Sequence, residues 1–397
     1  MTPLVLTHFT ATSCIGRGLQ ETLATLRERR TGLVPCKFET VELDTYIGEV
    51  SGSDAEQIPD ELGNFNCRNN RLAQLALRQD GFSAAVAELA GRWGRRRVGV
   101  FLGTSTSGIL ETELAYRRRD PGTGALPEDF NYRGMHNSFS VADFTRRRLG
   151  LEGPAVVVSS ACSSSAKVFG SARRMIEVGL IDAAVVGGVD SLCLTTLYGF
   201  HSLQLVSHLP CRPFDMARDG ISIGEAAAFA LLEKVPESLN ADAVMLLGIG
   251  ESSDAYHMSS PHPDGRGAKA AMLQALDTAG LQAADIDYIN LHGTGTPSND
   301  NAEARAVAAV LGSEVPGSST KGATGHALGA AGALEAVICG LALQHGFMPA
   351  GLNTTAVDPS LGVRYLLENC HGKVGRVMSN SFGFGGSNCS LIFGRAG

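Results

Sequence analysis

A cysteine among small hydroxyl residues is the first place in this sequence where chemistry is expected. Cys162 follows the β-branched run Val156–Val158 and precedes a helical pattern of apolar residues that begins at Ala166. The run predicts a buried strand, so Cys162 would lie at a strand-to-helix turn. There the first helix amides stabilise a thiolate and lower the pKa of the thiol. The segment by itself is equally compatible with a nucleophile and with an ordinary buried cysteine.

Two histidines further along the chain also lie among small residues. His292 ends an apolar run and precedes turn residues, which is how a rigid strand presents a catalytic base or donor, although a lone histidine is more often a core residue. His326 lies among glycines and alanines between Lys321 and Glu335. Only six of the 33 basic residues are lysines, so a lysine among these small residues indicates a specific role and not an ordinary solvent-exposed side chain. We expect Lys321 and Glu335 to form a buried charge pair that fixes a neighbouring side chain.

The elements that must position these residues alternate between strands and helices. Strands are expected over 3–10, 97–102, 156–158, 183–186, 227–232, 244–248 and 288–291, and helices over 19–29, 68–89, 111–119, 141–149 and 269–279. This alternation predicts an α/β fold. A glycine-rich turn at 380–388, N-S-F-G-F-G-G-S-N, would bring backbone amides close to a ligand, but such a turn alone is a weak signal.

A short internal echo indicates a duplication. The segment V-F-L-G-T-S-T at 100–106 resembles I-N-L-H-G-T-G-T at 289–296, and each precedes a further strand-and-helix unit. We therefore expect a duplicated fold, although one echo can arise by chance. The N-terminal half, 1–240, would carry Cys162, and the C-terminal half, 241–397, would carry His292 and His326, with a linker near 233–241.

Composition excludes several other classes of protein. The 397 residues include 44% hydrophobic and only 18% charged residues, which predicts a sizeable core, and the net charge of −7 gives no case for nucleic acid. The nine cysteines are scattered and never form a C-x-x-C pair, which argues against a disulfide framework and a zinc site. The N-terminus predicts a strand rather than a signal peptide, and no apolar run approaches the length of a membrane span. We expect a reduced, cytoplasmic location.

Four stretches together resemble the β-ketoacyl-acyl-carrier-protein synthases, the elongating condensing enzymes of the thiolase superfamily. They are S-S-A-C-S-S-S around Cys162, H-G-T-x-T-x-x-N-D from His292, K-x-x-x-x-G-H-x-x-G-A-A-G from Lys321, and the turn at 380–388; the R-P-F-D-x-x-R-D-G loop at 212–220 agrees as well. The resemblance is weakest over 31–66 and 109–150, and the first strand lacks the family's Gly-x-Gly turn. It implies a five-layered αβαβα fold made of two similar halves.

The resemblance implies a decarboxylative Claisen condensation that gives 3-oxoacyl-carrier protein. Cys162 would take an acyl chain from the phosphopantetheine arm of an acyl-carrier protein. His292 and His326 would promote decarboxylation of malonyl-carrier protein and stabilise the enolate. The supporting residues would be Lys321 and Glu335, which order the site; the amides of Cys162 and Phe384 as oxyanion hole, with the Phe384 ring as gate; and Thr294 and Thr296, which hold the pantetheine arm.

The resemblance also suggests partners. An acidic carrier protein would dock at Arg68 and Arg71, and the chain would work as a homodimer or with a chain-length-factor-like subunit. No metal or organic cofactor is implied beyond the carrier's own arm. The loop at 251–263 and the run at 68–70 are similar to the ketosynthases of aryl polyene pigment clusters, which leaves a polyenoyl chain and housekeeping fatty acid elongation as equal alternatives.

Two competing functions follow from the same fold. A degradative thiolase needs a second catalytic cysteine near the C-terminal glycine turn, and Cys389 lies three residues beyond Gly386 without the thiolase C-x-G pattern. A non-catalytic chain-length factor lacks the nucleophile, whereas Cys162 is present with both histidines. Initiating synthases carry asparagine where His326 stands, so the elongating type is favoured.

Overall fold

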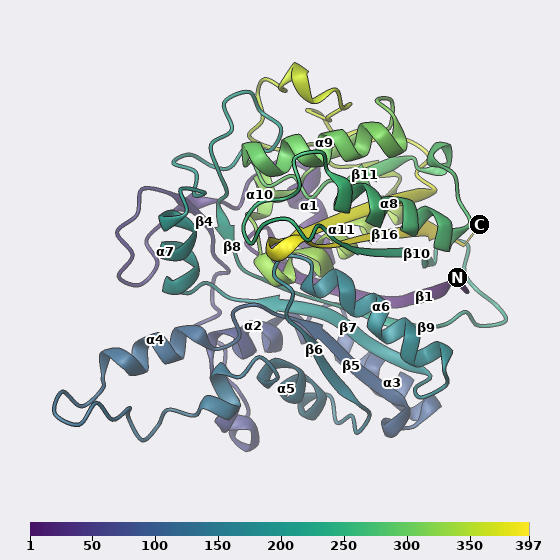
Figure 1. Cartoon of the computed structure of the whole chain (residues 1–397). Coiled ribbons are helices and arrows are strands. Elements are labelled where there is room, and N and C mark those ends of the chain that lie inside the picture. The colour runs from purple at the N-terminus through teal and green to yellow at the C-terminus, as the bar shows by residue number, and fades with distance from the viewer. Residues whose placement is uncertain (397) are drawn as a thin grey trace.

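The computed structural model describes residues 1–396 of the chain. An eleven-stranded mixed sheet passes through the whole molecule, with helices on its faces (Figure 1). The first part of the chain supplies β1 (Leu4–Ser13), β2 (Gly16–Arg17), α1 (Leu19–Arg27), β3 (Val34–Pro35), β4 (Tyr46–Gly48), α2 (Arg68–Leu77), α3 (Phe82–Trp93), β5 (Val98–Gly103), α4 (Ile109–Arg117), α5 (Ser140–Arg148), β6 (Ala155–Val158), α6 (Ser164–Glu177), β7 (Ala183–Asp190), α7 (Leu194–Ser202), β8 (Ile223–Gly224) and β9 (Ala226–Lys234).

The second part repeats the alternation. It supplies β10 (Val244–Ser253), α8 (Arg266–Ala279), β11 (Tyr288–Asn290), α9 (Pro297–Leu311), β12 (Gly317–Ser318), α10 (Lys321–Thr324), α11 (Ala331–His345), β13 (Phe347–Met348), β14 (Cys370–His371), β15 (Arg376–Gly383) and β16 (Ser387–Arg395). The connection between β9 and β10, residues 235–243, lies where the sequence predicts the boundary between the halves.

The sheet contains one five-strand pattern twice. Its order is β12-β11-β15-β16-β10-β1-β9-β7-β5-β6, so β6-β5-β7-β9-β1 mirrors β12-β11-β15-β16-β10. In each copy the first three strands are parallel and the other two pairings are antiparallel. The copies join where Leu4–Leu6 of β1 pairs with Val244–Leu246 of β10. The two echoing segments thus begin in equivalent strands, β5 and β11.

Alternation of side chains along the strands separates the interior into layers. In β5, Val98, Val100 and Leu102 pack with the outer helices α2, α3 and α5, whereas Phe101 packs on the opposite face with α6 and α11. In the second copy, Ile289 packs with α8 and α9, whereas Tyr288 faces the central helices. Both strands carry apolar side chains on both faces, which is typical of strands in a sheet that is covered on both sides. The α/β fold with five layers, which the sequence resemblance implied, is therefore confirmed, with α6 and α11 in the middle.

Helix α11 corrects one expectation from the sequence. Residues 328–345 are long and apolar enough to cross a membrane by composition, with mean hydropathy 1.3, but 89% of this segment is buried inside the protein. It is the central helix of the fold, which touches both halves of the sheet (Figure 1). A helix covered by protein on every side needs apolar residues all round.

The helix expected over 68–89 is wrong as a single element, because the chain breaks between α2 and α3. Asp80 and Gly81 both have positive φ, +50° and +67°. The Asp80 carboxylate accepts hydrogen bonds from Thr10 Oγ1 and the amide of Leu19. The Asp-Gly pair is a turn signal that a purely apolar pattern overlooks, and it ties both helices to β1 and α1.

Close packing of β5 on α6 gives a test of the fold. A Cβ on Gly103 would lie 2.3 Å from the backbone nitrogen of Ser165, so Gly103→Ala must displace the start of α6. We expect this variant to lose about 1–3 kcal/mol of stability and to melt at a clearly lower Tm in differential scanning fluorimetry. Gly91→Ala in α3 is the matched control, because a Cβ there meets nothing within 4 Å; an unchanged or slightly higher Tm is expected. Equal melting of the two variants would contradict this packing.

Candidate active site

The turn that carries Cys162 is strained and tightly packed. Ala161 adopts φ +52°, a left-handed conformation that is costly for a residue with a Cβ. Its carbonyl accepts from the amide and the hydroxyl of Ser164, which closes the turn at the start of α6. Cys162 lies at this point, between β6 and α6, as the sequence predicts, and its side chain is buried.

Small residues let the nucleophile helix meet the second half of the protein. The hydroxyl of Ser165 in α6 accepts from the amide of Ala333 in α11 at 2.9 Å. A Cβ on Gly332 would come within 2.8 Å of Ala166, so the two helices touch almost backbone to backbone. This contact brings Cys162 to the histidines of the C-terminal half.

His292 is held by charged groups of its own half. Its amide and that of Gly293 donate to the two oxygens of the Glu303 carboxylate at 2.8 and 2.7 Å. Burial raises the pKa of Glu303 to about 7, against the effect of these hydrogen bonds. The Lys321 ammonium donates to the carbonyl of His292 at 2.5 Å and lies 3.5 Å from its Nδ1.

His326 is held by backbone from the other half. Its amide donates to the carbonyl of Ser222 at 2.7 Å, and its carbonyl accepts from Gly224 at 2.9 Å. The amide of Leu328, two residues on, donates to Nδ1 of His326 at 3.2 Å. Because Nδ1 accepts, the proton of a neutral His326 ring lies on Nε2.

Both imidazoles are neutral donors. Burial, and then the charge of Lys321, hold the pKa of His292 and of His326 well below its ordinary value. The ring centroids lie 5.3 Å apart with the planes at 82°. A Lys321 proton aimed at Nδ1 of His292 likewise leaves its proton on Nε2. Neutral N–H donors facing a cavity suit the stabilisation of a developing oxyanion.

The Cys162 sulfur and one nitrogen from each of the two histidines lie within 4.8 Å of one another. That spacing also suits a thiophilic metal ion. A nearby ammonium group, from Lys321, opposes a bound cation, since it already acts on the thiol and on both rings. We interpret the trio as a nucleophile with two donors.

The lowered thiol pKa expected from the turn is wrong for the free protein. Burial raises the pKa of Cys162 to about 11, and the Lys321 charge and a hydrogen bond from the Phe384 amide only partly offset it. The sequence could show the helix start but not how completely the thiol is enclosed. A raised pKa keeps Cys162 a thiol until a substrate arrives.

Lys321 and Glu335 form the buried pair that the sequence predicts. Both side chains are almost wholly enclosed, and the ammonium donates to Glu335 Oε1. Burial raises the pKa of Glu335, whereas Lys321 lowers it. Removing one member would leave the other charge unpaired in the interior, which costs about 3–5 kcal/mol.

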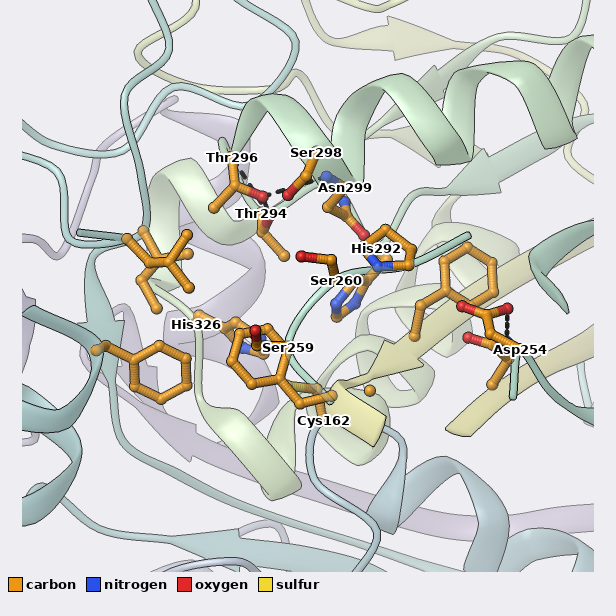
Figure 2. Close-up of a pocket in the computed structure, with 18 residues that line it drawn as sticks. Cys162, Asp254, Ser259, Ser260, His292, Thr294, Thr296, Ser298, Asn299 and His326 are labelled. Carbon is orange, nitrogen blue, oxygen red and sulfur yellow. Dashed lines mark hydrogen bonds between the residues drawn. The ribbon is translucent and has the colours of Figure 1, made fainter. Parts of the chain in front are cut away.

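One cavity joins these groups to the surface. It has a volume of about 40 Å³, and its lining includes Cys162, the two histidines, Thr294, Thr296 and the start of α9 (Figure 2). The hydroxyls of Thr294 and Thr296 bond to each other at 2.9 Å. Their position suits the predicted contact with a pantetheine arm.

The cavity also has walls that the sequence did not single out. The ring of Phe200 in α7 lies 5.4 Å from that of Phe384, so the residue predicted to act as a gate packs against an aromatic partner. The loop with Ser259 and Ser260 covers another side (Figure 2). Phe200 had no motif to mark it, because its role depends only on where α7 packs.

Arg68 is misplaced in the carrier-docking prediction. Its guanidinium is buried and bonds to both oxygens of Glu225, to Asp54 and to Glu49. A carrier protein cannot reach it, so Arg68 has a structural role. Glu225 lies 157 residues away in the sequence, which is why the pairing could not be foreseen. Arg71 is largely buried but keeps some exposure, and docking there stays a prediction.

The second cysteine of a thiolase is missing from the cavity. Cys389 lies in β16 with its side chain fully buried. Among residues 1–396, Cys162 is the one cysteine that lines the cavity. The structure therefore does not provide the acid that a degradative thiolase requires.

A buried thiol and two neutral donors, joined across the two halves of a five-layered α/β fold, define a Cys-His-His condensing enzyme. The family comparison agrees. Residues 1–238 match the model of the beta-ketoacyl synthase N-terminal domain, and residues 243–355 match that of the C-terminal domain. This chain belongs to the β-ketoacyl synthase family, and it is an acyl-transferring enzyme.

Named relatives support the same class. The chain is 32% identical over 418 residues to 3-oxoacyl-[acyl-carrier-protein] synthase 2 of Vibrio cholerae, with 99% of each chain covered. It is 40% identical over 264 residues to the mitochondrial 3-oxoacyl-[acyl-carrier-protein] synthase of Arabidopsis thaliana, which covers 62% of this chain and 57% of that protein.

Solved structures resemble it over its whole length. The ketosynthase ApeO of Xenorhabdus doucetiae, solved with its chain length factor ApeC, has TM-score 0.89 and 39% identity, covering 100% of this chain and 98% of that chain. The ishigamide ketosynthase/chain length factor has TM-score 0.89 and 29% identity, with 100% of each chain covered.

The raised pKa of Cys162 predicts how its reactivity depends on pH. Since the thiolate is the reactive form and the pKa is about 11, alkylation by iodoacetamide should rise about tenfold per pH unit between pH 7 and 9. Mass spectrometry of the Cys162 peptide after timed labelling measures this rate. Lys321→Met should slow it, because the ammonium lowers the pKa. A plateau below pH 8 would show that the thiol ionises more readily than its burial implies.

Proposed function

We propose that this chain holds an acyl group on Cys162 and condenses it with the malonyl unit of malonyl-acyl-carrier protein. The reaction is a decarboxylative Claisen condensation that yields 3-oxoacyl-carrier protein and CO₂. The observation that carries the proposal is the convergence of one thiol and two neutral imidazole donors on one cavity. Thr294 and Thr296 line the same cavity as Cys162, which suits a substrate delivered on the carrier's arm.

The first half-reaction moves the acyl chain. The Cys162 sulfur attacks the thioester carbonyl, and the pantetheine sulfur leaves with the proton that the thiol gives up. Amides of Cys162 and Phe384 would stabilise the tetrahedral oxyanion; in the free protein the Phe384 amide donates to the Cys162 sulfur. Splitting one condensation into two steps is the purpose of the acyl-enzyme.

The second half-reaction forms the carbon–carbon bond. CO₂ leaves the malonyl thioester, and the electron pair of the broken bond gives an enolate whose oxygen accepts from Nε2–H of His292 and His326. The enolate carbon then attacks the acyl-enzyme carbonyl, and Cys162 leaves as a thiolate. CO₂ leaves neutral, so the carboxylate's negative charge passes to the enolate and then to the Cys162 thiolate, which takes up a proton from solvent.

Separating the half-reactions tests these roles. Cys162→Ala should abolish condensation, and Cys162→Gln should retain or raise malonyl-carrier decarboxylation, measured as released CO₂. His326→Ala should lose about 10²–10³-fold in decarboxylation, the usual cost of an oxyanion donor, while Cys162 still becomes acylated. Condensation at the wild-type rate by Cys162→Ala would refute the proposal.

The acyl chain that Cys162 accepts belongs to one of two classes. We propose a polyenoyl chain of the aryl polyene type, with saturated fatty acyl elongation as the alternative. Support comes from the loop at 251–263 and the run at 68–70, which are similar to the ketosynthases of aryl polyene pigment clusters. Mass spectrometry of Cys162 exposed to saturated and polyenoyl carrier proteins would distinguish the two.

We further propose that β6 pairs with a second ketosynthase-fold chain. Within residues 1–396, β6 ends the sheet and pairs with β5 alone, and its four residues are half-buried and apolar. An apolar edge strand with free backbone groups recruits another strand. The partner would be a second copy, or a chain-length-factor-like subunit such as the one that accompanies ApeO.

A charged edge should prevent this pairing. Lysine on an edge strand blocks strand addition, so Val157→Lys should turn a dimer into a monomer in native mass spectrometry. Val178→Lys is the matched control, because Val178 is 69% exposed at the end of α6. A Val157→Lys protein that stays dimeric would rule out β6 as the interface.

We place the enzyme in the cytoplasm, where its nine unpaired cysteines would stay reduced. The substrates would arrive on the carrier's arm, so the reaction needs no separate cofactor. Docking near Arg71 would be guided by charge and would affect encounter more than affinity.

A further inference from the structure

A buried carboxylate outside the predicted site connects the two halves beside His326. Asp190 is the last residue of β7 and is fully buried. Within residues 1–396, none of the ion pairs involves Asp190. A buried carboxylate without a cation must be stabilised by hydrogen bonds.

Six donors surround the two oxygens of Asp190. Oδ1 accepts from the amides of Ser105 and Thr106 at 2.8 and 2.9 Å, and from the hydroxyls of Thr104 and Thr106 at 2.7 and 2.9 Å. These donors follow β5, in the same half as Asp190. Oδ2 accepts from the Ser105 hydroxyl and from the amide of Gly329 at 2.6 Å. Gly329 is the one donor from the other half.

The bond to Gly329 fixes the turn that follows His326. Leu328 adopts φ +48°, which is strained for a branched residue and needs support from its surroundings. In this conformation the Leu328 amide donates to His326 Nδ1 at 3.2 Å, and the next amide donates to Asp190. A Cβ on Gly329 would lie 2.8 Å from Asp190 Oδ2, so the approach requires glycine.

We propose that Asp190 is a positioning residue for His326. By holding the Gly329 amide, its carboxylate keeps the Leu328 amide aimed at Nδ1, which leaves the imidazole proton on Nε2, facing the cavity. Without that anchor the turn relaxes, the Nδ1 acceptor loses its donor, and the ring is free to rotate or to change tautomer. Asp190 acts through the backbone and touches no substrate.

The negative charge of Asp190 distinguishes this positioning role from a general structural one. The negative charge of Asp190 raises the pKa of Cys162, so a neutral replacement should make the thiol no less reactive. The same replacement should weaken the donor that His326 offers to the enolate. A loss of general structural integrity would instead reduce both functions together.

The test uses Asp190→Asn in the full-length protein, with Ser105→Ala as control. Asparagine keeps the size of the side chain but brings an N–H toward the Gly329 amide, which breaks that hydrogen bond. We expect kcat for malonyl-carrier decarboxylation to fall about 10- to 100-fold, as misplaced catalytic groups do. KM for malonyl-carrier protein and the rate of Cys162 acylation should change less than about threefold. Ser105→Ala removes one Asp190 donor, leaves Gly329 in place, and should decarboxylate at nearly the wild-type rate.

The imidazole itself supplies a second readout. Nitrogen-15 spectra of histidine-labelled protein distinguish protonated from unprotonated ring nitrogens, and His326→Ala identifies the signals. Wild-type His326 should be protonated at Nε2 alone, and Asp190→Asn should show mixed tautomers. If Asp190→Asn does not fold, Gly329→Ala displaces the same amide and should give the same pattern.

Several outcomes would overturn the inference. They are wild-type decarboxylation by Asp190→Asn, an equal loss of acylation and decarboxylation with a lower Tm, or an unchanged His326 tautomer. The inference rests on the proposed function for its kinetic effects. If the wild-type protein proves unable to acylate Cys162, the proposed function fails, and the spectra still decide whether Asp190 controls the His326 ring.

Discussion

The charge of the Lys321 ammonium group acts on all three reacting side chains of the site. This group is enclosed between Glu335 and the carbonyl of His292. Its charge adds to burial in holding the pKa of both imidazoles low, lowers the pKa of the Cys162 thiol against the effect of burial, and directs a proton toward Nδ1 of His292. One cation thus affects the pKa of two hydrogen-bond donors and of one nucleophile. The ammonium group can stay in the interior only because Glu335 pairs with it. The protonation of the thiol and of both imidazoles therefore depends on this ion pair staying shielded from water.

The duplicated fold explains how the parts meet. Cys162 comes from the turn after β6, and the histidines come from segments that follow β11 and α10 in the second half. Neither half contains the site alone. The small residues where α6 crosses α11, with the Ser165–Ala333 hydrogen bond, bring the two contributions within reach. Bulkier residues at that crossing would separate nucleophile from donors without touching either.

Much of this could be predicted from the sequence, because strand ends and glycine-rich turns carry local signals. Cys162, His292 and His326 stand in motifs whose order and spacing specify the site, and Lys321 and Glu335 flank one of them. The failures share a physical cause. The burial of Arg68 depends on its pairing with Glu225, which lies 157 residues away. The raised pKa of Cys162 follows from how completely the folded chain encloses the thiol. Asp190 likewise carries no motif, since three of its six donors are backbone amides, which any residue type can supply.

The enclosed, mostly protonated state of Cys162 has a consequence for chemical probes. Seven other cysteines, at positions 14, 36, 67, 193, 211, 339 and 389, also have a raised pKa, so intrinsic acidity does not distinguish the catalytic thiol from them. Its surroundings do, because Cys162 lines the cavity together with both histidines, whereas the partly exposed Cys14, Cys36 and Cys370 lie outside that cavity. A covalent inhibitor must therefore gain its selectivity from its fit to the cavity that Cys162 shares with Thr294, Phe200 and Phe384, and not from the acidity of the thiol.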